Sequence, residues 1–132
     1  MDRLGTVDDG LVAAIEELPS DAARRDRALA IVRSVTARLD VQDEPAVAGV
    51  LTGSADEAAL NALVERLDEQ AWERRDAGDD DSYLEIFSRA RAANAALEYA
   101  SGGADGNLAD VAYEAYGATG DVAFLLGLLR AS

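Results

Sequence analysis

The chain of 132 residues contains no cysteine, no histidine and no lysine, so all 12 of its basic residues are arginine. These absences exclude disulfides, zinc sites built from His or Cys, and Ser-His-Asp or Cys-His nucleophiles. Chemistry that depends on a lysine amine is excluded as well. What remains is the chemistry of carboxylates, hydroxyls, amides and guanidinium groups, and no catalytic motif stands out among them.

Long hydrophobic runs are also missing. The longest wholly apolar run, 122–129, has eight residues, whereas a helix that crosses a membrane needs about 20. The first residues lack the basic-then-apolar layout of a signal peptide. We therefore expect no membrane association and a cytoplasmic location.

Acidic residues are abundant: 26 Asp and Glu face 12 Arg, which gives a formal net charge of −14. Such a charge repels nucleic acid, so we expect none as a partner. Three explanations compete, namely adaptation to molar salt, an ordinary high-GC genome, and a functional surface for a basic partner, as in a DNA mimic or an immunity protein. We favour salt adaptation, because the absence of lysine and the excess of Asp over Glu resemble the composition of halophilic archaeal proteins and the acids are scattered along the chain.

Helical signals dominate the sequence. Alanine is frequent, proline occurs only at Pro19 and Pro45, and no segment alternates apolar and polar residues. We predict one all-α domain over 1–132, a compact bundle of five to six helices with mostly antiparallel neighbours. The predicted helices cover about 8–18, 20–39, 54–77, 79–100, 108–118 and 121–130, and the connection 41–53 can hold a short helix that begins at Pro45. Capping boxes at 54–57 and 82–85 mark two helix starts.

Three glutamates, Glu65, Glu69 and Glu73, lie four residues apart and so share one face of their predicted helix. Carboxylate ridges bind Mg²⁺ in all-α pyrophosphohydrolases, which use an ExxE pair opposite an ExxD pair. This chain has only E-x-x-x-E spacings. We therefore favour a solvated face and expect no cofactor. The alternative is a Mg²⁺ phosphohydrolase in which acids of a facing helix complete the site; the candidates are Asp81, Glu85 and Asp110.

Two further residues interrupt apolar stripes. Asn94 falls on the same predicted face as Phe87 and Leu97, so we predict a buried amide with an internal hydrogen bond; a dimer axis or a ligand contact is the alternative. Trp72 lies at the edge of its stripe, where the indole is expected to pack by its body and to leave its N–H toward solvent or a partner.

The last predicted helix is apolar around nearly its whole circumference. Such a helix is either the centre of the bundle or is shared with another chain. The residues predicted to form a homodimer interface are Val122, Phe124, Leu125, Leu128 and Leu129.

These features favour a non-enzymatic interaction or regulatory module that self-associates as a homodimer and carries a salt-adapted surface. The alternatives from other classes are the Mg²⁺ phosphohydrolase and an acidic inhibitor, immunity protein or DNA mimic that meets a basic partner.

Overall fold

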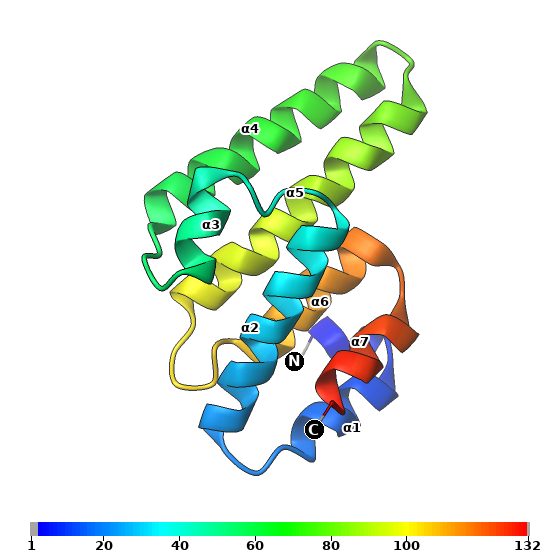
Figure 1. Cartoon of the computed structure of the whole chain (residues 1–132). Coiled ribbons are helices and arrows are strands. Elements are labelled where there is room, and N and C mark those ends of the chain that lie inside the picture. Colours follow the sequence, from blue (N-terminus) through cyan, green and yellow to red (C-terminus); the bar gives the residue numbers. More distant parts are fainter. Residues whose placement is uncertain (1–2, 132) are drawn as a thin grey trace.

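The computed structural model of the protein describes residues 3–131. Within them all regular structure is helical, in agreement with the predicted all-α class. A 3-10 turn, η1 (Arg3–Thr6), is followed by α1 (Asp9–Glu16), α2 (Asp21–Arg38), α3 (Pro45–Leu51), α4 (Glu57–Asp76), α5 (Asp80–Ser101), α6 (Leu108–Thr119) and α7 (Val122–Leu129) (Figure 1). The described chain thus has seven α-helices instead of five to six, because the segment that begins at Pro45 folds as a helix of its own.

Helix starts are set by side chains that accept a hydrogen bond from a backbone N–H of the first turn. Ser20 accepts from Ala23 N at 3.1 Å, as the sequence predicts. The predicted capping boxes at 54–57 and 82–85 are wrong. Asp56 caps α4 and accepts from Ala59 N at 3.1 Å, while the Ser54 N–H is bound to Gly49 O at 2.7 Å in the turn after α3. Asp79 caps α5 and accepts from Ser82 N at 3.2 Å.

Helix α5 is the centre of the bundle, with α4 on one side and α6 and α2 on the other (Figure 1). Small side chains allow this close approach. The fully buried residues of α5 are all alanine: Ala90, Ala92, Ala93, Ala95 and Ala96. Leucine, isoleucine and valine side chains from the surrounding helices fill the space between the elements.

The end of the α4–α5 hairpin projects beyond the other helices (Figure 1). We call residues 72–87 the arm. The arm turns at Gly78, which has a positive φ of 79° and donates its N–H to Arg75 O at 3.0 Å. Glycine adopts this left-handed conformation without the strain that a Cβ would add.

Helix α7 closes the bundle against α1, α2 and α6. Leu125 and Leu129 are 0% and 2% exposed, because three elements wrap this short helix and bury their side chains in the core. The assignment of α7 to a homodimer interface stays a prediction. Val122, Phe124 and Leu128 are half-buried and pack against the same core. Across residues 3–131 we find no helix that is long and apolar enough to cross a membrane.

Candidate functional site

The six acidic residues considered as metal ligands do not form one site. Glu65, Glu69 and Glu73 are exposed on α4. The other three lie on α5 and α6: Asp81 is exposed, Glu85 accepts from Arg89 at 3.0 Å, and Asp110 accepts from Arg3 at 3.0 Å. Within the described range, no three acidic side chains are grouped so that they could hold a metal ion.

Asn94 is half-buried, which is less burial than the sequence predicts for its amide. The physical reason is the position of the buried face of α5, which follows its alanines and not the line from Phe87 to Leu97. At 100° per residue, Asn94 lies just outside the arc that runs through Ala93 and its buried neighbours.

The arm carries the large exposed apolar side chains of the described chain. Trp72 is 53% exposed and Leu84 is 58% exposed. The Trp72 ring lies 6.3 Å from that of Tyr83, which in turn lies 5.9 Å from that of Phe87. We call Trp72, Tyr83 and Phe87 the aromatic patch, and the exposed Leu84 lies next to Tyr83 in the sequence of the arm. Since a contiguous apolar group on a surface marks a site of contact more often than an isolated residue does, this patch is a candidate interaction surface.

The arm that carries the patch is acidic. The arm holds six acids and two arginines, so its net charge is 2 − 6 = −4. The acids are all exposed: Glu73, Asp76, Asp79, Asp80, Asp81 and Glu85. The side chain of Arg75 lies over two of the rings, with its guanidinium carbon 4.9 Å from the ring centre of Trp72 and 5.8 Å from that of Tyr83. An apolar surface with this rim is complementary to a basic partner.

At the base of the arm, Arg91 joins three helices. Its Nη1 donates to Glu114 Oε1 of α6 at 3.0 Å, and its Nη2 donates to both oxygens of Asp68 of α4 at 3.2 Å. Glu114 is only 4% exposed. A carboxylate buried to this extent needs a charged partner, and Arg91 supplies it.

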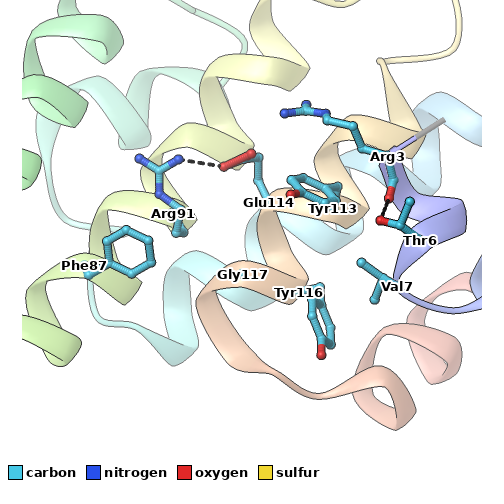
Figure 2. Close-up of a pocket in the computed structure, with 9 residues that line it drawn as sticks. All are labelled: Arg3, Thr6, Val7, Phe87, Arg91, Tyr113, Glu114, Tyr116 and Gly117. Atoms are coloured by element: carbon cyan, nitrogen blue, oxygen red, sulfur yellow. Dashed lines mark hydrogen bonds and ion pairs between the residues drawn. The ribbon is translucent and has the colours of Figure 1, made fainter. Parts of the chain in front are cut away.

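Beside this cluster lies a pocket of about 430 Å³, drawn in Figure 2. Helix α6 forms its floor and α5 one side, while the N-terminal segment closes the opposite side. The lining residues are Arg3, Thr6, Val7, Phe87, Arg91, Tyr113, Glu114, Tyr116 and Gly117. Phe87 belongs both to the pocket and to the aromatic patch.

A second acidic group lies where α5 meets the start of α6. Glu98 accepts a hydrogen bond from Asn107 Nδ2 at 2.7 Å. Its pKa is raised above the usual range, first by burial and then by the nearby charges of Asp110 and Glu114. Arg3 lowers it, as does the hydrogen bond from Asn107, but these effects are smaller.

Sequence reasoning missed the pocket and the Arg91 cluster, because the residues that meet there are far apart in the chain. One signal was present: Gly117 interrupts a good helical pattern, and such a glycine often marks close packing or function. No family model matches the chain, and no match is found among curated proteins or solved structures.

Proposed function

We propose that the chain is a non-enzymatic protein-interaction module that binds a basic segment of a partner protein, with apolar side chains, on the aromatic patch of the arm. The observation that carries this proposal is the exposure of Trp72 and Leu84 on a hairpin that projects from the bundle. Burying such side chains contributes about 1.5–3 kcal/mol each. Docking of a partner there would therefore recover free energy that the isolated chain does not gain.

Charge favours a basic partner segment over a second copy of this chain as the occupant of the patch. A second copy would bring another net charge of −14 and a second arm of −4 against the first, whereas a basic segment would be attracted to the rim of exposed acids. The apolar circumference of α7, which favours a homodimer at the level of sequence, is largely accounted for by packing within one chain. Self-association through Val122, Phe124 and Leu128 stays a prediction that sedimentation can test.

Trp72 is the only tryptophan of the chain, so its fluorescence reports directly on the patch. The probe is a synthetic amphipathic helical peptide with leucine on one face, lysine on the other and no tryptophan. We expect it to shift the Trp72 emission to shorter wavelength, because the peptide removes water from the indole. The same peptide with glutamate in place of lysine should leave the emission unchanged.

Two double variants separate local from overall charge, since both raise the net charge by the same amount. Asp80→Asn with Asp81→Asn changes the arm, while Glu16→Gln with Glu17→Gln changes exposed acids of α1 and its end. Only the arm variant should weaken peptide binding strongly. Equal weakening by both variants would contradict a local docking surface. A blue shift that grows with protein concentration alone, together with a doubled mass in light scattering, would assign the patch to a second copy.

A further inference from the structure

Helix α6, which forms the floor of the pocket next to Arg91, has one lining residue without a side chain, Gly117. Gly117 lies inside α6, where glycine is a poorer helix former than alanine. Packing does not demand a glycine here, because a Cβ on this residue would meet the nearest atom, Cγ of Arg91, at an ordinary distance of 3.5 Å. Three carbons of the Arg91 side chain lie 3.5–3.9 Å from that Cβ position, so Gly117 leaves the pocket bordered there by the Arg91 stem and by no side chain of its own (Figure 2).

The charged groups of the lining already have ion-pair partners within the chain, although Nε of Arg91 is buried without a hydrogen-bond partner. Arg91 donates to Glu114 at 3.0 Å, and Arg3 donates to Asp110 at 3.0 Å. The hydroxyl of Thr6 donates to the carbonyl oxygen of Arg3 at 2.7 Å. A charged ligand would have to compete with these ion pairs, whereas an uncharged ligand would leave them intact.

Aromatic rings make up most of the remaining lining. The guanidinium carbon of Arg91 lies 5.3 Å from the ring centre of Phe87, and that of Arg3 lies 4.5 Å from the ring centre of Tyr113. The chain's own cations thus cover one face of Phe87 and one face of Tyr113, so an added cation would gain less from these two rings. Tyr113 and Tyr116 also carry phenol hydroxyls, which can donate to or accept from a neutral polar group.

We infer that this pocket binds a small uncharged aromatic molecule that carries a hydroxyl or carbonyl group, with its ring over Gly117 between Phe87 and Tyr116. The volume of about 430 Å³ lies within the range of roughly 300–1,000 Å³ of small-molecule sites. Offset and edge-to-face packing against the rings would orient the ligand. The inference does not depend on the proposed docking of a partner, because all the lining residues except Phe87 lie outside the aromatic patch.

Three probes of the same shape test the inference: 2-phenylethanol, the 2-phenylethylammonium cation and the phenylacetate anion. Each is titrated into protein labelled with ¹³C in its tyrosine rings. We expect the signals of Tyr113 and Tyr116 to shift and that of Tyr99, which lies outside the lining, to stay in place. For a ligand of about nine heavy atoms a dissociation constant on the order of 1 mM is expected for the alcohol. Both charged probes should bind at least about tenfold more weakly.

A matched pair of variants connects binding to the floor of the pocket. Gly117→Leu fills the floor, while Gly127→Leu adds the same side chain to a helical position of α7 with no atom within 4 Å of its Cβ. The first should weaken 2-phenylethanol binding about tenfold or more, and the second should leave it unchanged. If circular dichroism shows that Gly117→Leu does not fold, Gly117→Ala is used instead. It should also weaken 2-phenylethanol binding, but by less. The inference is overturned if no probe shifts the two tyrosines, if a charged probe binds more tightly than the alcohol, or if filling the floor leaves binding unchanged.

Discussion

Replacing Arg91 by methionine is expected to destabilise the protein by about 3 kcal/mol, because the change leaves the Glu114 carboxylate buried without its partner. Removing one member of a buried ion pair costs about 3–5 kcal/mol. The side chain of Glu114 is 5% exposed, whereas that of Asp68 is 35% exposed and already meets water. The cost therefore arises mainly from Glu114, and the lower end of the range applies.

A loss of this size is a large share of the stability of about 5–15 kcal/mol that is usual for one domain. With a denaturant slope of about 1–3 kcal/mol per molar urea, the unfolding midpoint should fall by roughly 1–3 M. Urea unfolding followed by far-ultraviolet circular dichroism measures both the midpoint and the slope. The slope should stay constant if only stability changes.

Two further variants test the reasoning. Arg66→Met removes the exposed ion pair between Arg66 Nη2 and Glu44 Oε2, which lie 2.8 Å apart. This variant should lower the free energy of unfolding by less than about 1 kcal/mol. Arg91→Met combined with Glu114→Leu leaves no buried charge and should recover most of the lost stability. The argument is refuted if the Arg91 and Arg66 variants cost the same, or if the double variant is less stable than Arg91→Met alone.

Three other predictions concern charge and the arm. The raised pKa of Glu98 means that the folded state holds the carboxyl proton more tightly than the unfolded state, so stability falls as pH rises from the unfolded pKa through the folded pKa. Glu98→Gln should therefore raise the melting temperature at pH 7 but not at pH 4, and an equal gain at both pH values would contradict this argument. For the whole chain at net charge −14, the melting temperature should rise steeply between 0.1 and 2 M KCl, because the Debye length shrinks from about 10 Å to below about 3 Å; a flat profile would count against salt adaptation. Gly78→Ala places a Cβ at φ 79° and should cost about 1–2 kcal/mol, measured by urea unfolding, whereas Gly127→Ala should stabilise by about 0.5–1 kcal/mol.

The existence of most helices is predictable from the sequence, because apolar spacing and alanine content act locally. Exact starts are less predictable where several capping residues lie close together. Within 54–57 both Ser54 and Asp56 can cap, and in the structure Asp56 does so while Ser54 belongs to the turn after α3. The half-exposure of Asn94 likewise depends on which neighbours α5 meets, and this is a property of the assembled bundle.

The pocket and its buried charges depend on contacts that no local pattern encodes. Arg91 lies 23 residues after Asp68 and 23 residues before Glu114. The three side chains meet because α4, α5 and α6 pack side by side. Each residue taken alone resembles an ordinary surface charge. The exposure of Trp72 was the one part of the candidate surface that helical geometry indicated, since it lies at the edge of its stripe.

The packing of α7 on α1 affects the order in which the protein can be completed during translation. These two helices stand near opposite ends of the described chain and contact each other, so the loop that joins them is nearly as long as the chain. Leu11 and Ala14 of α1, almost fully buried in the finished fold, therefore reach their final packing only after α7 has been made. A nascent chain stalled before Val122 would leave the side of α1 that packs on α7 uncovered and open to chaperones or proteases.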